Sequence, residues 1–459
     1  MKYLYRTVEG LTINSLKKKD LLTLGFMMFS IYFGAGNLIF PPALGQAAGD
    51  HTLHAMLGFM TTGIGLPLLG ITAIALAGGE YVPLLHAKTW PRFATVLLVI
   101  LYLIIGPLFA MPRTGAVSFE IGIRPFLSAD NLALGQIIYT AVFFASSYYL
   151  ALNPNKIIDR VGRMLTPALL IVLLILFVQA FHAPLGAILP ATGAYIDAPF
   201  AQGFQDGYQT MDLLASIAIG ALVANAVRMR GITDSRAVGA ACLVSGLITV
   251  MLMAAVYGSL AYIGATSTSI LGQAENGGQI LSAAVGIFFG SAGNLLLAVI
   301  IGLACLTTCC GITSSAAMFF NKLLKGRISY ERLLLFSILF SFAASNVGLT
   351  QIIALAIPFL VTIYPLIIVF VILSLFDRFI GWRKSIYQGA MALTLVFSFI
   401  DGLHAAGLSS EPVHALLVAY IPFYNIMMGW VCPAVIGALV GLIISFFQTV
   451  PRAAEESHV

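Results

Sequence analysis

Long apolar stretches, separated by short polar segments, follow one another along most of this chain. They repeatedly reach the roughly 20 residues that a helix needs to cross the hydrocarbon core of a bilayer. We predict an all-α membrane protein of about twelve transmembrane helices, at residues 21–47, 54–80, 93–121, 131–152, 164–182, 204–227, 237–266, 292–321, 331–347, 350–376, 385–407 and 414–447. Residues 274–291 are predicted to form a short re-entrant or capping helix rather than a crossing.

The first predicted helix is interrupted by Gly34, Ala35, Gly36 and Asn37. A membrane helix breaks only where protein or a water-filled cavity satisfies the freed backbone groups. Unwinding here would expose carbonyls that suit a cation, and amides at a positive dipole end that suit a carboxylate. Tight helix packing through small residues is the alternative interpretation of the same glycines.

A second interruption is predicted in the sixth helix, around residues 203–212. Asp212 is followed by mostly apolar residues as far as Arg228, so we expect its carboxylate to lie inside the membrane. A buried carboxylate there is costly and is a functional candidate by default. Capping of the second half-helix by Asp212 remains the structural alternative. Asp206 is expected nearer the outer surface.

The two breaks lie at corresponding places in two halves of the chain, which is the sequence pattern of a transporter built from inverted repeats. We therefore predict one membrane domain, 1–459, with a first repeat at about 21–182, a second at about 204–376 and two further helices at about 385–447.

The eighth helix carries an unusual cluster of hydroxyl side chains: Thr307, Thr308, Thr313, Ser314 and Ser315. Hydroxyl and carbonyl oxygens can replace the water around a sodium ion. The alternative is that these hydroxyls bond back to their own helix, which is common. For Thr307 and Thr308, opposite a broken first helix, we favour the ion-binding interpretation.

Charge modifies this picture in two ways. Only 9% of the residues are charged and 60% are hydrophobic, whereas a soluble domain carries about 25% charged residues. If the N-terminus is cytoplasmic, only Arg113 and Arg124 of the 23 Lys and Arg residues fall on the outer side. The positive-inside bias predicts this asymmetry. We expect both termini in the cytoplasm, and basic loops that set topology rather than bind nucleic acid.

Arg113, Glu120 and Arg124 are spaced so that they share one face of the third helix. We expect an ordinary salt bridge at the outer interface, or an ion pair in an outer vestibule. The five cysteines lie inside apolar segments and are interpreted as packing residues. No HExxH motif, nucleophile elbow or phosphate-binding loop occurs, which argues against an enzyme and against ATP-driven transport.

Four segments, FGAGNLIFPP, GPLFAMPRTGAVSFEIG, GYQTMDLLASIAIG and ACLTTCCGITSS, resemble the bacterial branched-chain amino acid:cation symporters over essentially the whole chain. The resemblance implies a leucine-transporter-like five-plus-five inverted repeat. It also implies substrate contacts from the helix-1 break, with less secure ones from the sixth helix, and a sodium site on the eighth helix. The implied substrate residues are Gly34, Ala35, Gly36, Asn37, Tyr208, Gln209, Thr210 and Asp212, and the implied sodium residues are Ser30, Phe33, Ala304, Thr307 and Thr308.

The sequence thus predicts a symporter of a bacterial inner membrane that imports leucine, isoleucine and valine with Na⁺ as the coupling ion and no other cofactor. Proton coupling on the same fold, with Asp212 titrating, is the nearest alternative. A channel or non-transporting membrane scaffold is the alternative from another class.

Overall fold

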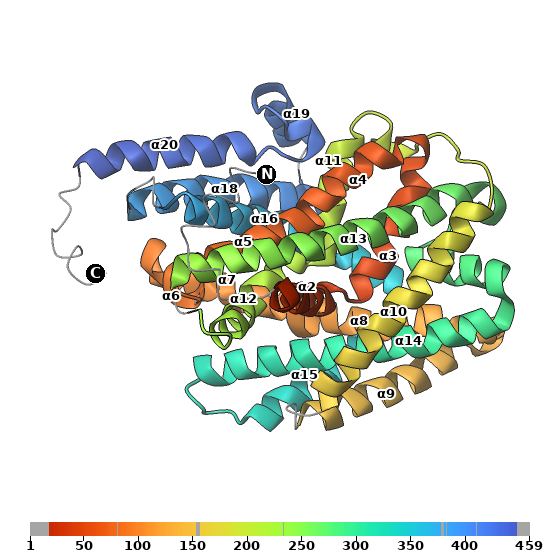
Figure 1. The fold of residues 1–459 in the computed structure, drawn as a ribbon. Coiled ribbons are helices and arrows are strands. Elements are labelled where there is room, and N and C mark those ends of the chain that lie inside the picture. The colour runs from red at the N-terminus through yellow and green to blue at the C-terminus, as the bar shows by residue number, and fades with distance from the viewer. Residues whose placement is uncertain are drawn as a thin grey trace.

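A computed structural model describes residues 18–79, 81–152, 157–232, 234–377, 381, 383–409 and 411–447. Within these ranges every regular element is helical. The helices run roughly side by side along the long dimension of the molecule, with the short α19 at one edge (Figure 1). The all-helical prediction is confirmed.

The helices fall into three groups along the chain. The first comprises α2 (Lys18–Tyr32), α3 (Ala35–Ala48), α4 (Thr52–Met60), α5 (Leu66–Leu76), α6 (Tyr81–Lys88), α7 (Pro91–Leu103), α8 (Ala110–Gly122), α9 (Leu132–Ala151) and α10 (Ile157–His182). The second comprises α11 (Pro199–Asp206), α12 (Asp212–Arg228), α13 (Ser235–Leu271), α14 (Gly277–Leu323), α15 (Tyr330–Ser345) and α16 (Leu349–Leu375). The last comprises α18 (Lys384–Ala405), α19 (Glu411–Tyr420) and α20 (Val431–Phe447).

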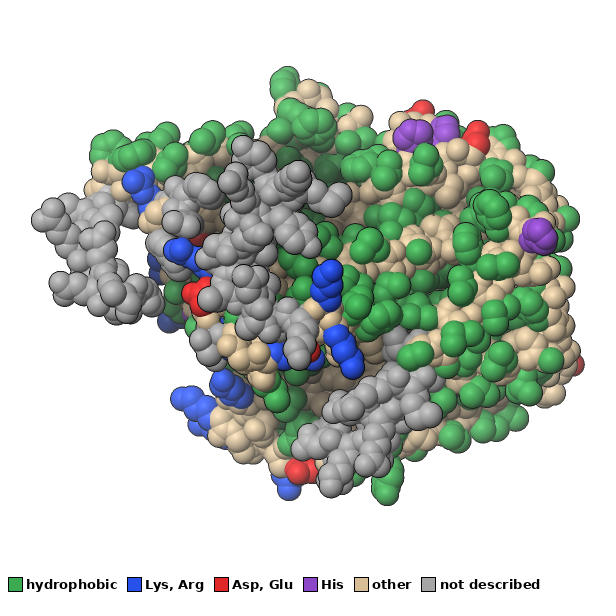
Figure 2. Space-filling view, in the orientation of Figure 1, with side chains coloured by type: hydrophobic (Ala, Val, Ile, Leu, Met, Phe, Trp, Pro, Cys, Tyr) green, Lys and Arg blue, Asp and Glu red, His purple; other side chains and the backbone are tan. Residues whose placement is uncertain are grey.

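Seven helices of the described chain are long and apolar enough to cross a membrane, or eight if the bent pair α11–α12 counts as one span. Several crossings that the sequence predicts are split by a break or shortened, so the number of about twelve stays a prediction. Hydrophobic side chains cover much of the face seen in Figure 2, whereas its Lys and Arg side chains gather toward the left. The expected distribution of these charges between the two sides of a membrane stays a prediction.

The two broken helices occupy equivalent places in the packing. The first, α2 and α3, packs along α13, and the sixth, α11 and α12, packs along α4 and α5. Helix α8 contacts both α14 and α16, while α14 also contacts α10. Exchanging the halves of a five-plus-five repeat would convert these contacts into one another. Contacts between α3 and residues Gly207–Thr210 place the two breaks beside each other.

The predicted helix at 414–447 is wrong as a continuous element. It is divided into α19 and α20 by a segment in which Phe423 and Met427 adopt left-handed backbone conformations, with φ of 65° and 57°. Pro422 contributes no N–H donor and cannot continue the hydrogen-bond ladder of α19.

Local irregularities also interrupt other parts of the described chain. Residues 104–108, between α7 and α8, form a π-helical turn in which Gly106 leaves helical geometry just before Pro107. In α14, Gly290 adopts φ 64° and ψ −160°. That kink separates the beginning of α14 from its long crossing, so the predicted short helix before the eighth crossing is present.

Candidate functional site

The first helix breaks at Phe33 and Gly34, where the glycine-rich segment predicts it. Gly34 is extended, with φ −123° and ψ −169°, and no side chain caps the start of α3. The first amides of a helix have no acceptor within that helix. The N–H groups of Ala35 and Gly36 therefore point out of the helix end, which is the arrangement that binds carboxylates.

The sixth helix breaks between α11 and α12, which are inclined to each other by 47°. Residues Gly207–Thr210 form a tight turn, and Met211 then takes a left-handed conformation with φ 61°. Asp212 begins α12 and its own N–H donates to Thr210 Oγ1 over 3.3 Å. At this break the carbonyl oxygen of Gln209 accepts a hydrogen bond from another helix, α8.

Asn37 joins the two breaks. Its Nδ2 donates to Asp212 Oδ2 over 3.0 Å and to the carbonyl oxygen of Tyr32 over 3.0 Å. Tyr257 of α13 also reaches Asp212 Oδ2, at 3.5 Å. Asp212 is 4% exposed. The structure thus places the carboxylate that the sequence singled out against the first turn of α3.

Arg113 is the largest departure from the expected site. It was expected at the outer interface with Glu120 and Arg124, but it lies 4% exposed between the two breaks. Its Nη1 donates to the carbonyl oxygen of Gln209 over 2.6 Å, and its guanidinium stands 5.1 Å from the ring of Phe40. A methyl group on Gly36 would lie 3.0 Å from Arg113 Nη2. The sequence contains one indication of this burial, because Arg113 lies inside the predicted membrane helix at 93–121 and not in a loop.

Thr308 of α14 lies beside the first break. A methyl group on Gly34 would lie 3.4 Å from Cγ2 and 3.7 Å from Oγ1 of Thr308. The Thr307 hydroxyl instead donates to the carbonyl oxygen of Ala304 over 2.9 Å, as the back-bonding alternative predicts. Phe33 is buried at the break and Ser30 is half-buried one turn earlier in α2. Of the predicted sodium residues, Thr308 is the hydroxyl that meets the broken segment.

The other predicted residues of the sixth helix have different surroundings. The ring of Tyr208 stacks on Tyr364 of α16, with centroids 4.3 Å apart, and does not bond to Asp212. The Thr210 hydroxyl donates to the carbonyl oxygen of Gly207 over 2.9 Å. Gln209 offers its carbonyl to Arg113, while its buried Oε1 has no hydrogen bond within the described chain.

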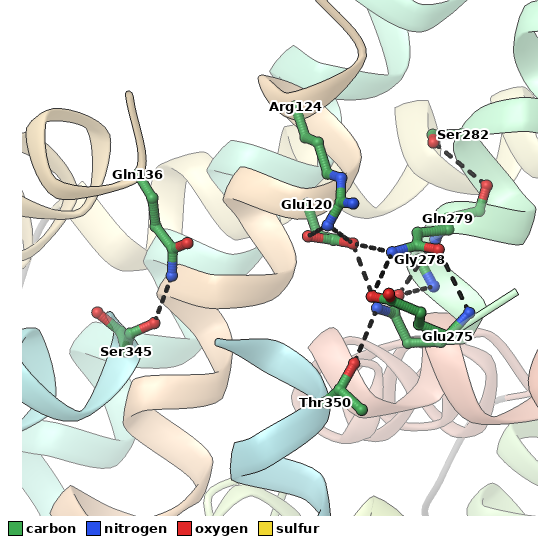
Figure 3. Close-up of polar contacts among 10 residues, drawn as sticks. Glu120, Arg124, Gln136, Glu275, Gly278, Gln279, Ser282, Ser345 and Thr350 are labelled. Carbon is green, nitrogen blue, oxygen red and sulfur yellow. Dashed lines mark hydrogen bonds and ion pairs between the residues drawn. The ribbon is translucent and has the colours of Figure 1, made fainter. Parts of the chain in front are cut away.

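A separate polar group, here called the outer cluster, consists of Glu120, Arg124, Asn276, Gln279 and Thr350 (Figure 3). Glu120 Oε1 accepts from Arg124 Nη1 at 2.9 Å, from Gln279 Nε2 at 2.8 Å and from Asn276 Nδ2 at 3.2 Å. Asn276 Nδ2 also lies 3.4 Å from Thr350 Oγ1. The salt bridge expected between Glu120 and Arg124 is confirmed. The hydrogen bonds from Asn276 and Gln279 to Glu120 fasten the start of α14 to α8.

Two interrupted helices that meet inside an all-helical membrane protein, with a buried carboxylate, a buried guanidinium and a hydroxyl at the junction, are typical of secondary transporters. A family profile described as "Branched-chain amino acid transport protein" matches residues 17–448. The chain belongs to this family. It is accordingly a membrane transport protein and not an enzyme.

Characterised relatives are similar over nearly their whole length. The chain is 46% identical to the branched-chain amino acid permease BraB of Bacillus subtilis (strain 168), over 95% of this chain and 97% of that protein. It is 43% identical to the branched-chain amino acid transport system 2 carrier protein of Pseudomonas aeruginosa, over 96% and 99%. It is 38% identical to the permease BrnQ of Escherichia coli (strain K12), over 94% and 96%.

Solved structures share the fold at low sequence identity. Mhp1, a nucleobase-cation-symport-1 family transporter, matches with a TM-score of 0.56 and 15% identity over 92% of both chains. MhsT in complex with L-phenylalanine matches with a TM-score of 0.54 and 17% identity, over 92% of this chain and 98% of that one. These likenesses assign the leucine-transporter-like fold.

Proposed function

We propose that this protein is a sodium-coupled symporter that imports leucine, isoleucine and valine across a bacterial inner membrane. Membership of the family and the names of the relatives support the substrate class. The observation that carries the proposal is the junction of the two breaks, where Asn37 of α3 bonds to Asp212 of α12 while Thr308 lies against Gly34. An amino acid and a cation would bind side by side there.

The substrate carboxylate would meet the amides of Ala35 and Gly36, and its ammonium the carbonyls of the sixth-helix turn and Asp212. Asn37 would hold Asp212 in place. Sodium would bind between the first and eighth helices, with carbonyls of Ser30, Phe33 and Ala304 and hydroxyls of Thr307 and Thr308 as ligands. Thr307 donates its hydroxyl hydrogen to Ala304 in this structure, and the lone pairs of the same oxygen would remain for the ion.

The architecture that serves this mechanism is a first repeat at about 21–182 and an inverted second repeat at about 204–376, with two additional helices at about 385–447 and both termini in the cytoplasm. A bundle of the first, second, sixth and seventh helices would rock against the remaining helices. The packing of α2–α3 on α13 and of α11–α12 on α4–α5 supports this bundle.

Coupling to sodium supplies the driving force. Import of one positive charge with each substrate gains about 2.3 kcal/mol per 100 mV of membrane potential. This corresponds to about fiftyfold accumulation before any sodium gradient is added. A neutral zwitterion cannot draw on the membrane potential by itself, so the ion is needed for concentrative uptake.

Uptake by the full-length protein in proteoliposomes tests the proposal. An inward sodium gradient without a pH gradient is expected to accumulate labelled leucine above its external concentration. Unlabelled isoleucine and valine are expected to compete, and lysine is not. Equilibration without accumulation under every gradient would contradict the proposal and indicate a channel or scaffold.

The burial of Asp212 favours one second candidate, a proton-coupled symporter on the same fold. A carboxylate that is 4% exposed and bonded to Asn37 and Tyr257 is placed where it could carry a proton between the two sides. In the same proteoliposomes, accumulation driven by a proton gradient in sodium-free buffer would select this mechanism. Accumulation that requires sodium would exclude it.

A further inference from the structure

Arg113 carries more hydrogen-bonding capacity than the protein uses. Its guanidinium is buried within the membrane domain, where a charged side chain is costly and functional by default. A guanidinium has five N–H donors. Within the described chain one of them is in a hydrogen bond, from Nη1 to the Gln209 carbonyl, and the buried Nε has none. The remaining donors are available to an acceptor from outside the protein.

The surroundings of Arg113 favour an anion in direct contact with its guanidinium. Arg113 lies against Gly36 and Phe40, in the first two turns of α3. The N-terminal end of a helix carries partial positive charge, which favours anions and disfavours cations. The described salt bridges are Lys88–Asp377 and Glu120–Arg124, so no carboxylate of the described chain lies within ion-pair distance of Arg113. Asp212 attracts Arg113 through space, but its carboxylate is bonded to Asn37 and Tyr257. A guanidinium and a helix N-terminus that converge in this way form a receptor for a carboxylate.

A receptor for an ammonium group lies beside it. Asp212 contacts Asn37, the residue next to Gly36, so the negative and positive side chains meet adjacent residues of α3. The buried Oε1 of Gln209 has no hydrogen bond in the described chain, and the Gln209 carbonyl is occupied by Arg113 itself. Unused donors and unused acceptors thus lie within one junction, which matches the two ends of an α-amino acid.

We infer that Arg113 binds the carboxylate of the substrate and exchanges partners when it does so. Without substrate, Arg113 donates to the Gln209 carbonyl and bridges the two halves of the site. The substrate carboxylate replaces the Gln209 carbonyl as the acceptor of the Arg113 hydrogen bonds. The planar guanidinium matches the two carboxylate oxygens. The freed Gln209 carbonyl then accepts from the substrate ammonium beside Asp212. This inference rests on the proposed function and adds the receptor that selects zwitterions.

The ligand chemistry follows from this exchange. A molecule that has the ammonium and the branched side chain but no carboxylate leaves Arg113 on Gln209 and finds that carbonyl occupied. L-Leucinamide is such a molecule. Removing one partner of a buried, hydrogen-bonded charge pair commonly weakens binding by at least about thirtyfold. Wild-type protein is therefore expected to bind leucine at least about thirtyfold more tightly than leucinamide.

Equilibrium binding to the purified full-length protein tests this, with leucine and with leucinamide at mildly acidic pH, where the amide is a cation. In Arg113→Gln, leucine affinity is expected to fall at least about thirtyfold while leucinamide affinity changes less than about threefold. The matched control is Arg124→Gln, which removes an arginine that lies two residues beyond the end of α8 and is already paired with Glu120. It should leave the leucine-to-leucinamide ratio unchanged.

If Arg113→Gln binds leucine and leucinamide more weakly by the same factor, the inference is overturned and the role of Arg113 is structural. If Arg113→Gln does not fold, Arg113→Lys decides the matter. It keeps the charge but loses the fork, so a reduced leucine-to-leucinamide ratio supports the inference and an unchanged ratio overturns it. Failure of the proposed function is distinct from these outcomes, because wild-type protein would then bind no leucine at all.

Discussion

The arginines at the two ends of α8 have opposite surroundings. Arg124, just beyond the end of the helix, has a side chain 38% exposed and forms an ion pair with Glu120 at 2.9 Å. Arg113, in the first turn, is buried and donates one hydrogen bond to a backbone carbonyl. The outer arginine is satisfied by the protein, whereas the central arginine is not.

The difference between the two arginines separates charges that stabilise the fold from charges that are available to bind a ligand. The outer cluster is a closed network in which Glu120 receives three donors from the end of α8 and the start of α14. The junction of the two breaks is open, because donors on Arg113 and an acceptor on Gln209 have no partner in the described chain. We expect substitutions at the junction to change binding and substitutions in the outer cluster to change stability.

The largest effect is expected from Asp212→Asn. The change keeps the shape of the side chain but removes the negative charge opposite Arg113, and breaking one side of a buried charge arrangement costs about 3 kcal/mol or more. Leucine affinity, measured by equilibrium binding, should fall about a hundredfold. Glu120→Gln is the matched control, because it changes a buried carboxylate at the other end of α8. This variant should retain its affinity for leucine. Equal affinities in wild type and Asp212→Asn would remove Asp212 from the substrate site.

Thr308→Ala should have the next largest effect on function. It removes the hydroxyl that lies against the first break, so the sodium concentration for half-maximal leucine uptake should rise about tenfold, the value of roughly one hydrogen bond to a charged group. Thr307→Ala is the paired variant, because the Thr307 hydroxyl bonds to its own helix in this structure. A smaller sodium shift is expected there. An unchanged sodium dependence in Thr308→Ala would exclude Thr308 as a ligand.

Glu120→Gln should affect stability rather than binding. The neutral side chain weakens three hydrogen bonds to a buried charged acceptor, and we expect a loss of about 2 kcal/mol in the free energy of unfolding. Thermal unfolding in detergent, followed by intrinsic fluorescence, measures the change. A normal unfolding midpoint with weakened leucine binding would reverse the roles that we assign to the two ends of α8.

Arg124→Gln should have the smallest effect. Its partly exposed pair with Glu120 contributes about 0.5 kcal/mol, which is ordinary for an ion pair that water can reach. The unfolding midpoint should fall less than in Glu120→Gln, and the difference should shrink at high salt because salt screens exposed charges. A larger loss than in Glu120→Gln would mean that Arg124, and not the buried carboxylate, organises the outer cluster.

The sequence predicts the parts of this structure that depend on local chemistry. Glycines at 34 and 36 mark the first break, and a lone carboxylate at 212 marks the second. The length of each apolar stretch predicts the helices that run without interruption. The spacing of Glu120 and Arg124 predicts their salt bridge because four residues make one helical turn.

The remainder depends on where elements meet in three dimensions. Counting charges in loops treats each arginine as a marker of an interface, so it placed Arg113 outside. The break after α19 was missed because Pro422 lies in an apolar run whose hydropathy is that of a helix. The stacking of Tyr208 on Tyr364 depends on the packing of α16 against the sixth-helix turn, which no local pattern reports.

Linkage between sodium and leucine tests the central claim most directly. If a cation beside Thr308 and a zwitterion between the two breaks share one site, each must raise the affinity of the other by the same factor. Equilibrium binding of leucine to the purified protein should be at least about tenfold tighter in sodium than in choline, and sodium should bind tighter in saturating leucine by that same factor. Leucine binding of equal strength in sodium and in choline would contradict the account.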